Sequence, residues 1–295
     1  MRPQKFEDIV GQESVVNRLK ISAYGCKKTS TSMPHVLIDG PPGLGKTTIA
    51  SAIASELGVN MYIANAANIR NIKSILPYLM NITANSVLFV DEIHRLPKVV
   101  EEFLYPVMED FRIDLLIEDN PESIDIPEFT LVGATTSGGS LSQPFYDRFT
   151  IKEHLSFYKP DVLAKLAGSN CDSLKIAVPD DDLLEIAKRS KGTPRILKAR
   201  LQWYKNYREF YPEENDVNKI FECQGIDKNG FDQNDKQYIS ILKKNRGKPL
   251  GLKAMSSLTG IAMETIENSI EPYMIREGYV IRTQRGRILG KVKGV

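Results

Sequence analysis

The chain has 295 residues and is long enough for more than one hydrophobic core, because single cores stop growing near about 250 residues. Its 42% hydrophobic and 26% charged residues and its net charge of +2 are ordinary for a globular protein, and no apolar run approaches the roughly 20 residues of a membrane helix. Membrane insertion is therefore not expected, and three scattered cysteines with no secretory pattern at the amino end favour the cytoplasm.

Short apolar runs alternate with helical periods through the first half of the chain. The runs are "HVLID" at 35–39, "VLFVDE" at 87–92 and "FTLVGATT" at 129–136. Strands that are buried on both faces and separated by helices are typical of a parallel sheet in an α/β domain. We expect this domain to span residues 1–158.

The segment "GPPGLGKTT", residues 40–48, follows the first of these runs and precedes a helical period. In this context the glycines let backbone amides close around phosphate oxygens, the lysine adds charge at the β and γ phosphates, and the first threonine offers its hydroxyl to Mg²⁺. A structural turn without a ligand is the weaker interpretation. The predicted nucleotide-binding residues of the loop are Gly43, Gly45, Lys46, Thr47 and Thr48.

Two acidic residues stand at the end of the second run, where α/β sheets place their ligands. Asp91 is predicted to hold magnesium, and Glu92 to orient and polarise the attacking water. A pair of surface acids is the alternative, but the phosphate loop requires a metal-bearing carboxylate. His94 either senses the site or is a structural histidine at a helix start, and its position favours the second interpretation.

Hydroxyls end the third run. Thr135 or Thr136 is predicted to form a hydrogen bond with the γ-phosphate or the water, and we take Thr136 as the candidate. Arg148, in "QPFYDRFT", follows an apolar turn on the far side of the domain, so it can serve a neighbour's nucleotide; a surface pair with Asp147 is the alternative. Arg195, in "GTPR", can report hydrolysis from a helix start, unless it simply faces solvent.

Two further units are expected after the α/β domain. Residues 159–228 have a helical pattern, with Thr193 as an N-cap and Pro194 at the first helical position of one helix. After a polar, glycine-containing linker, residues 229–295 predict three helices and two strands folded about residues 284–286. This pattern is typical of a winged helix, a common DNA-binding module.

The carboxyl end of the chain is basic. From residue 276 onward a single acid, Glu277, accompanies six basic residues, which are Arg276, Arg282, Arg285, Arg287, Lys291 and Lys293. Such an end fits a polyanion, although a solvated basic tail is an equal alternative from charge alone.

With these residues in place, the chain resembles the AAA+ ATPases, and among them the RuvB family of Holliday junction branch-migration motors. The resemblance extends over nearly the whole chain. It is carried by "RPQKFEDIVGQ", "HVLIDGPPGLGKTT", "VLFVDEIHRLPKVVEEFLYPVMEDF", "TLVGATT", "DRF", "KGTPRI" and "IENSIEPYMIREGYVIRTQRGR".

The resemblance implies roles for residues that composition and spacing leave unassigned. ATP and Mg²⁺ are the implied cofactors, Arg148 matches the arginine finger and Arg195 the second sensor. Arg282 and Arg287 match the DNA-contacting arginines of the wing. The remaining implied nucleotide contacts are Met1 and Arg2 at the adenine pocket, Glu109, Asp110 and Phe111 near the nucleotide, and Tyr158 at the start of the lid.

Partners are also implied by the resemblance. They are double-stranded and four-way junction DNA, five further copies of the chain in a homo-hexamer ring, RuvA, and RuvC as an additional candidate. The hairpin that meets RuvA corresponds to residues 113–126, where this sequence is a few residues short, and Tyr146 stands where the family usually has an arginine.

The sequence therefore predicts a three-part, ATP-driven DNA translocase that migrates Holliday junctions. A second hypothesis is a nucleotide-gated loader or regulator that binds DNA without sustained translocation, and a third is a remodeller of a protein substrate. Glu92 and Arg148 favour turnover over gating. Phosphate contacts suit a motor because they are insensitive to sequence.

Overall fold

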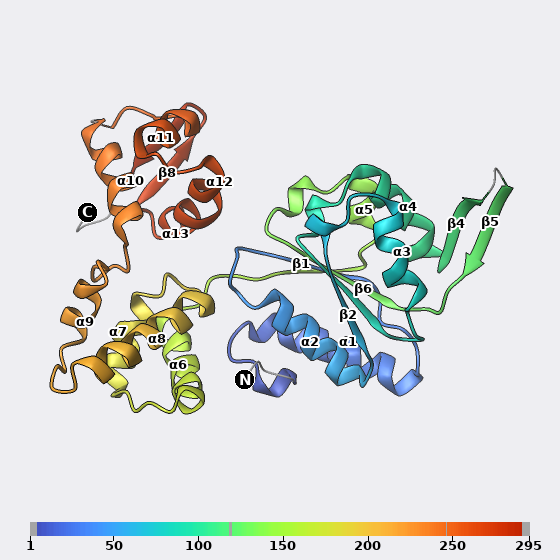
Figure 1. Ribbon diagram of the computed structural model, residues 1–295, viewed down its shortest axis with the longest axis horizontal. Helices are drawn as coiled ribbons and strands as arrows, with labels where there is room; N and C mark the ends of the chain where they lie inside the picture. The colour runs from blue at the N-terminus through green and yellow to red at the C-terminus, as the bar shows by residue number, and fades with distance from the viewer. Residues whose placement is uncertain (1–4, 118–119, 246, 291–295) are drawn as a thin grey trace. The chain divides into compact units, whose positions relative to one another are not determined.

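The computed structural model describes residues 5–117, 120–245 and 247–290 (Figure 1). Met1 and Arg2 lie outside the described residues, as do Lys291 and Lys293. The chain forms two compact units, the first from residues 1–40 and 45–156 and the second from residues 41–44 and 157–295. Within the described residues, no helix is both long and apolar enough to cross a membrane.

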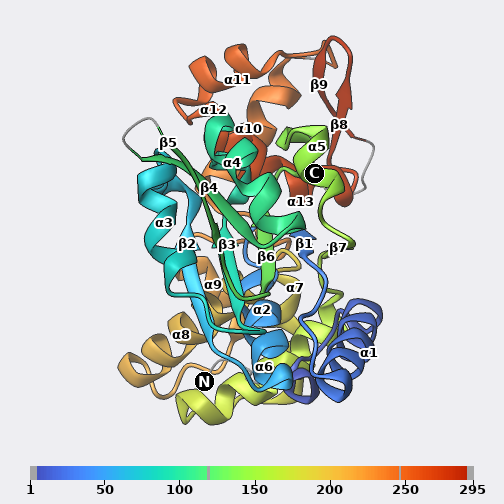
Figure 2. The same cartoon turned by 90° about the vertical axis from the view of Figure 1, so that its right-hand side faces the viewer.

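The first unit is built on a five-stranded parallel sheet with the order β2-β3-β6-β1-β7. Figure 2 shows the five strands side by side in this order. The strands are β1 (Val36–Asp39), β2 (Met61–Asn65), β3 (Val87–Asp91), β6 (Thr130–Thr135) and β7 (Ile151–His154). Because all five run the same way, their carboxyl ends share one edge, called here the carboxyl edge, and the opposite edge is called the amino edge. The predicted α/β fold is confirmed.

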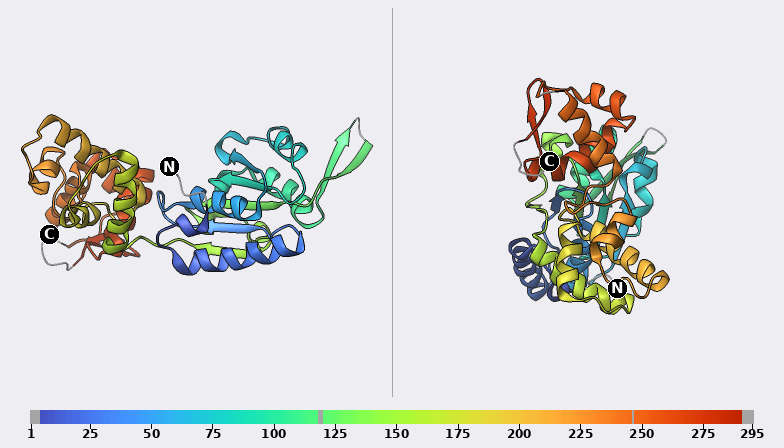
Figure 3. Two further views of the ribbon diagram at one scale, coloured as in Figure 1. Left: turned by 90° about the horizontal axis from the view of Figure 1, so that it is seen from below. Right: turned by 90° about the vertical axis from the view of Figure 1, so that its left-hand side faces the viewer.

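Helices cover both faces of this sheet (Figures 1 and 3). One face carries α1 (Glu13–Thr29) and α2 (Lys46–Leu57), and the other carries α3 (Ile72–Met80) and α4 (Lys98–Glu109). Short elements complete the unit, namely η1 (Phe6–Asp8), η2 (Ala66–Asn68), η3 (Ile93–Arg95), η4 (Gly138–Ser140) and α5 (Gln143–Asp147). The central strands are therefore buried on both faces, which explains their continuous apolar sequence.

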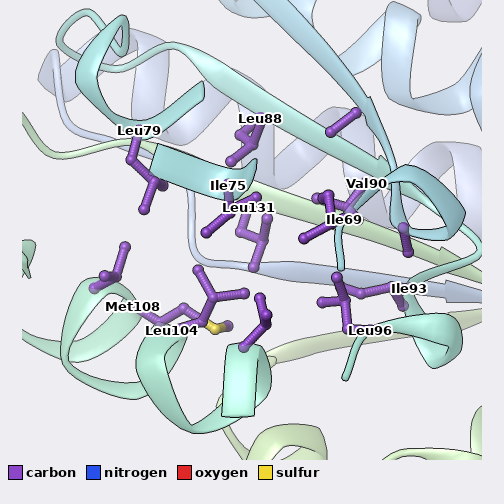
Figure 4. Packing of buried hydrophobic residues seen from close by; sticks show 14 of the residues in the cluster. Ile69, Ile75, Leu79, Leu88, Val90, Ile93, Leu96, Leu104, Met108 and Leu131 are labelled. Carbon is purple, nitrogen blue, oxygen red and sulfur yellow. The ribbon is translucent and has the colours of Figure 1, made fainter. Parts of the chain in front are cut away.

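The core between the sheet and helices α3 and α4 is a hydrophobic cluster (Figure 4). It includes Ile75, Leu79, Leu88, Leu104, Met108 and Leu131. This packing fixes β3 and β6 against each other, and both strands end at the carboxyl edge. A hairpin of β4 (Arg112–Ile117) and β5 (Asn120–Asp125) follows α4 and projects from the unit (Figure 1).

The second unit begins with four helices. They are α6 (Pro160–Leu174), α7 (Asp180–Lys188), α8 (Pro194–Phe210) and α9 (Val217–Cys223). Helix α8 begins as expected, with Thr193 as N-cap and Pro194 at its first position, but the Thr193 hydroxyl donates to the Ser190 carbonyl rather than accepting from a helix amide. We call these four helices the lid.

The remainder of the second unit is a winged helix. Its helices are α10 (Gln233–Lys244), α11 (Leu252–Thr259) and a segment formed by α12 (Met263–Thr265), η5 (Ile266–Ile270) and α13 (Glu271–Arg276). Its wing is the antiparallel pair β8 (Val280–Thr283) and β9 (Gly286–Leu289). The π-turn of η5 precedes Pro272, whose ring lacks the amide that a regular α-helix needs there.

Candidate nucleotide site and DNA-contacting wing

The phosphate loop leaves β1 at the carboxyl edge and leads into α2. Gly40 has φ +144°, and a Cβ there would lie 2.6 Å from the Leu155 carbonyl oxygen. Gly45, the N-cap of α2, has φ +103°, also in the region that favours glycine. The sequence needs glycine at both positions. The loop ends at the amino terminus of a twelve-residue helix, where backbone amides and the helix dipole favour an anion.

Lys46 is the first residue of α2 and is buried. Its Nζ donates to the Gly40 carbonyl over 2.7 Å, so the ammonium lies within the loop. Thr47 and Thr48 follow in the first turn and are partly exposed. The arrangement brings a cation, two hydroxyls and helix amides together, which is the chemistry that a triphosphate requires.

Asp91 ends β3, and Glu92 follows with φ +51°, a strained conformation for a residue with a side chain. The Glu92 amide donates to Asp91 Oδ1 over 3.0 Å. Both carboxylates are partly exposed at the carboxyl edge, on the strand next but one to β1. A side chain held by backbone strain at this edge is what a fixed catalytic base needs.

The structure separates the two threonines that end β6. Thr135 is fully buried, and its Oγ1 accepts from the Ser137 amide over 2.9 Å. Thr136 is partly exposed and donates its hydroxyl to Glu92 Oε2 over 3.3 Å. The geometry therefore supports Thr136 rather than Thr135 as the residue that faces the reacting groups.

The donor set at this edge fits Mg²⁺. Thr47 supplies a hydroxyl and Asp91 a carboxylate, and magnesium prefers oxygen ligands from one or two protein groups with the rest from phosphate and water. Among the described residues, no group of three or more His, Cys, Asp or Glu side chains forms a metal cage. A site completed by the nucleotide is consistent with both observations.

Arg148 lies at the other edge of the same sheet. It precedes β7, whose first amide, that of Ile151, donates to the carbonyl of His35 just before β1. The Arg148 guanidinium lies 3.9 Å from the centre of the Tyr105 ring, and its Nη2 donates to Glu109 Oε2 over 3.2 Å. Its Nε is buried without a hydrogen-bond partner.

The residues after α4 share this amino edge with Arg148. His35 Nε2 lies 2.9 Å from the Met108 carbonyl oxygen, and the ring of Phe111 packs edge-on against His35. Asp110 is the exposed C-cap of α4. Since the phosphate loop is at the carboxyl edge, the predicted nucleotide contacts of Glu109, Asp110 and Phe111 can apply only to the nucleotide of another copy of the chain.

Two predicted nucleotide residues belong to the second unit, together with loop residues 41–44. The buried Tyr158 donates its hydroxyl to the Leu44 carbonyl over 3.4 Å, and its amide donates to the Gly192 carbonyl over 2.9 Å. The exposed Arg195 donates its backbone amide to the Gly43 carbonyl over 3.3 Å. Both residues therefore contact the middle of the phosphate loop.

The two predicted DNA-binding arginines face each other across the wing, since Arg282 pairs with Arg287 in the β8–β9 register. Arg282 is half exposed and pairs with Glu267. Arg287 is nearly buried, and its Nε donates to Glu271 Oε1 over 2.8 Å. The DNA contact of Arg287 stays a prediction, and it would compete with this buried ion pair.

Sequence reasoning missed several partners of these residues. His94 Nδ1 lies 3.0 Å from Thr135 Oγ1 and 3.4 Å from Glu92 Oε2, so this histidine belongs to the site. Glu267 and Glu271, four residues apart on one helical segment, hold the wing arginines. Their i, i+4 spacing in the sequence indicates that both glutamates lie on one face of a helical segment, but it does not show that this face meets the wing.

Two family models match the parts of the chain that carry these residues. Residues 1–155 match the model of the "Holliday junction DNA helicase RuvB P-loop domain", and residues 228–294 match the "RuvB C-terminal winged helix domain". A RuvB branch migration complex subunit from Nitratiruptor sp. is 40% identical over 98% of this chain and 88% of its own, and one from Campylobacter hominis is 41% identical over 98% and 87%.

A solved structure, the Thermotoga maritima RuvB Holliday junction branch migration motor, superimposes with a TM-score of 0.90 at 36% identity. The superposition covers 98% of this chain and 95% of that one. Both family models and the full-length similarity thus lead to one assignment: the chain belongs to the RuvB family of P-loop ATPases.

Proposed function

We propose that this protein is an ATP-driven DNA translocase that migrates Holliday junctions during recombination and repair. The observation that carries the proposal is the placement of Lys46 and Glu92 at one edge of the sheet and of Arg148 at the other. Relatives named as subunits of the Holliday junction branch migration complex support it. The phosphate loop supports nucleotide binding, and ATP is the substrate proposed here.

The nucleotide is proposed to bind with its phosphates against the loop residues Gly43, Gly45, Lys46, Thr47 and Thr48. Resemblance to the family adds Met1 and Arg2 at the adenine, although both lie outside the described residues. Thr47 and Asp91 would hold Mg²⁺, which supplies charge neutralisation at the phosphates when bound.

Glu92 is the proposed general base. As the water oxygen bonds to the γ-phosphorus, the bond to the ADP oxygen breaks and a proton of the water passes to the Glu92 carboxylate. Thr136, which donates to Glu92 over 3.3 Å, would orient the base and the water. The position of Glu92, directly after the buried strand β3, supports the role of general base because the sheet fixes that position.

Arg148 is proposed to act on the nucleotide of the neighbouring copy in a homo-hexamer ring. Its own phosphate loop is at the opposite edge of the sheet, so a ring is the assembly that supplies an arginine to each site. Glu109, Asp110 and Phe111 would accompany it. An arginine in trans can raise the rate by about 10³ to 10⁵ because it meets charge that develops on the transferred phosphoryl group.

Arg195 and Tyr158 are proposed to carry the loss of the γ-phosphate to the lid. Their contacts with the loop carbonyls of Gly43 and Leu44 support this role. The wing would then move along DNA, with Arg282 in contact with a phosphate. Arg287 would either contact DNA beside it or stabilise the wing through its ion pair with Glu271. Double-stranded and four-way junction DNA are the proposed substrates.

RuvA is the proposed partner of the β4–β5 hairpin, with RuvC as a further member of the assembly and the cytoplasm as its compartment. The hairpin projects from the first unit and exposes Leu116, and an exposed apolar residue on a projecting hairpin fits a protein partner.

The test is a four-way junction assay with labelled arms. The protein should separate the junction into duplexes when ATP is hydrolysed, and Glu92→Gln should bind ATP and DNA without separating them. If ATP binding alone sufficed, the protein would be a nucleotide-gated loader. If DNA-stimulated hydrolysis survived Arg282→Ala with Arg287→Ala, a protein substrate would be favoured.

A further inference from the structure

We propose that His94 is a positioning residue that holds the Glu92 carboxylate by one oxygen, Oε2, and so leaves the other oxygen, Oε1, to accept the proton of the attacking water. This inference rests on the proposed function, because it assigns a partner to the catalytic base. It also reverses the interpretation of His94 as a purely structural histidine at a helix start.

The position of His94 follows from the strand that carries the base. His94 is the middle residue of the single turn η3 that follows β3, and two residues separate it from Asp91. Its side chain is 20% exposed, and that of Glu92 is 32% exposed. Ile93, which stands between these two residues, is buried in the core and anchors the turn. The backbone that carries the imidazole is therefore held in place.

The contacts of the imidazole indicate which nitrogen bears the proton. Nδ1 lies 3.4 Å from Glu92 Oε2 and 3.0 Å from Thr135 Oγ1. A carboxylate only accepts hydrogen bonds, so an unprotonated Nδ1 would direct a lone pair at the lone pairs of Oε2. The tautomer with a proton on Nδ1 removes this repulsion and donates between the two oxygens.

Thr135 is fixed on its own account. Its hydroxyl oxygen accepts from the Ser137 amide over 2.9 Å, and the residue is fully buried. The hydroxyl oxygen has two lone pairs, so it can also accept a hydrogen bond from a protonated Nδ1. Thr135 therefore holds the imidazole ring in place, while Thr136 and His94 contact the Glu92 carboxylate.

Two polar side chains lie close to the same carboxylate oxygen. Thr136 Oγ1 donates to Glu92 Oε2 over 3.3 Å, and His94 Nδ1 approaches Oε2 from η3. Within the described part of the chain, Oε1 receives no such donor. A carboxylate held at one oxygen cannot rotate freely, and the remaining oxygen keeps the fixed direction that proton transfer requires.

The tests use three substitutions of one residue. His94→Ala removes the donor. His94→Asn places an amide nitrogen close to the position of Nδ1, whereas His94→Gln places it nearer to the position of Nε2. A role in positioning Glu92 therefore predicts that Asn replaces His and Gln does not. A role in filling space predicts that the larger Gln does as well as Asn.

Steady-state ATP hydrolysis and equilibrium binding of a fluorescent ATP analogue are measured for the intact chain and each variant. His94→Ala should lower kcat by about 10- to 100-fold, the range for a misplaced catalytic group, with KM and analogue binding unchanged. His94→Asn should recover most of kcat and His94→Gln little. An unchanged kcat in His94→Ala, or equal rates for Asn and Gln, overturns the inference.

A spectroscopic measurement on the unaltered chain is independent of turnover and of any variant's folding. The sequence has three histidines, so their ring nitrogen signals can be assigned by substitution. We expect the Nδ1 of His94 to be protonated. His35 is the internal contrast, because its Nδ1 accepts from the Leu131 amide over 2.9 Å. An unprotonated Nδ1 on neutral His94 overturns the inference.

Glu92→Gln separates this inference from the proposed function. If Glu92→Gln still hydrolyses ATP at the original rate, Glu92 is not the base and the proposed mechanism fails. If Glu92→Gln is inactive while His94→Ala keeps its kcat, the mechanism stands and His94 has no part in it.

Discussion

The ammonium of Lys191 and the carboxylate of Asp235 form a buried ion pair that joins the lid segment before Arg195 to the first helix of the winged helix. The two side chains are 8% and 2% exposed, and Asp232, the N-cap of α10, lies 3.5 Å from the same ammonium. Lys191 has φ +49° and Gly192 φ +71°, so this link begins on a strained turn. The ion pair therefore links that turn to the first turn of α10.

The first prediction concerns this ion pair. Asp235→Asn should destabilise the second unit by about 3 kcal/mol, the low end for breaking a buried pair, because Asp232 still faces the lysine. The measurement is hydrogen exchange of the α10 amides in the full chain. Lys219→Met, which breaks the exposed pair with Glu214, is the control and should leave protection nearly unchanged.

Equal losses in Asp235→Asn and Lys219→Met would contradict the role of the buried pair. The double variant Lys191→Met with Asp235→Leu should recover much of the protection, because apolar residues can replace a buried pair without leaving a charge unpaired. Its DNA-stimulated hydrolysis then reports whether the link needs charge or only packing.

The second prediction separates the two arginines of the wing. Arg287→Ala should destabilise the wing by about 3 kcal/mol, the low end for breaking a buried pair, because buried Glu271 would keep only half-exposed Arg282, 3.5 Å away. Tyr238, which also donates to Glu271 over 2.8 Å, cannot neutralise that charge. Exchange of the β8–β9 amides measures the loss.

Arg282→Ala should instead leave wing stability nearly unchanged and lower DNA affinity. The slope of log affinity against log salt should fall by roughly 0.9 for one lost phosphate contact. Exposed Ile281→Ala, on the same strand, is the matched control without a charge. An unaltered salt slope in Arg282→Ala would remove Arg282 from the DNA interface.

The third prediction concerns pH and His35. Burial lowers the pKa of His35 below its ordinary value of 6.5, and its ring donates to the Met108 carbonyl and accepts from the Leu131 amide. The unfolded chain therefore binds a proton more readily than the folded chain. The free energy of unfolding should fall as pH drops below about 6.5 and level off below the folded pKa.

His35→Gln is neutral at every pH and should remove this acid-dependent loss, although it starts from a lower stability. His154→Gln is the control, because His154 is 63% exposed. Denaturant unfolding at a series of pH values is the measurement. If His35→Gln keeps the same decline below pH 6.5 as the unaltered chain, the decline has another source.

The fourth prediction concerns the β4–β5 hairpin. Leu116 is 78% exposed there, and Leu116→Lys should abolish stimulation by RuvA without changing hydrolysis in its absence. Exposed Leu258→Lys, on α11, is the control for an added charge at an apolar surface position. Stimulation that survives Leu116→Lys would contradict the proposed contact between this hairpin and RuvA.

Most of the fold could be predicted because its signals are local. Apolar runs, the glycines of the phosphate loop and the acids after β3 each specify their own element. What could not be predicted depends on tertiary pairing. Thr135 and Thr136 have the same side chain, and only the end of β6 decides which one faces Glu92.

The same limit applies to the charged partners. The sequence around Arg287 is that of an exposed wing, yet Arg287 is nearly buried and forms an ion pair with Glu271 of α13. Arg148 was expected to act on a neighbour, but nothing local indicated that Glu109 would hold it in its own chain. Each of these pairings joins residues at least 16 positions apart, beyond the reach of helix or strand periodicity.

In the proposed mechanism, each ATP site is completed by Arg148 of another copy. The direct measurement mixes two inactive variants: Arg148→Ala, which keeps Lys46 and Glu92, and Glu92→Gln, which keeps the arginine. In mixed rings some sites combine Glu92 of one variant with Arg148 of the other. ATP hydrolysis should therefore return on mixing. Mixed rings, verified by native mass spectrometry, that stay as inactive as either variant alone would contradict the account.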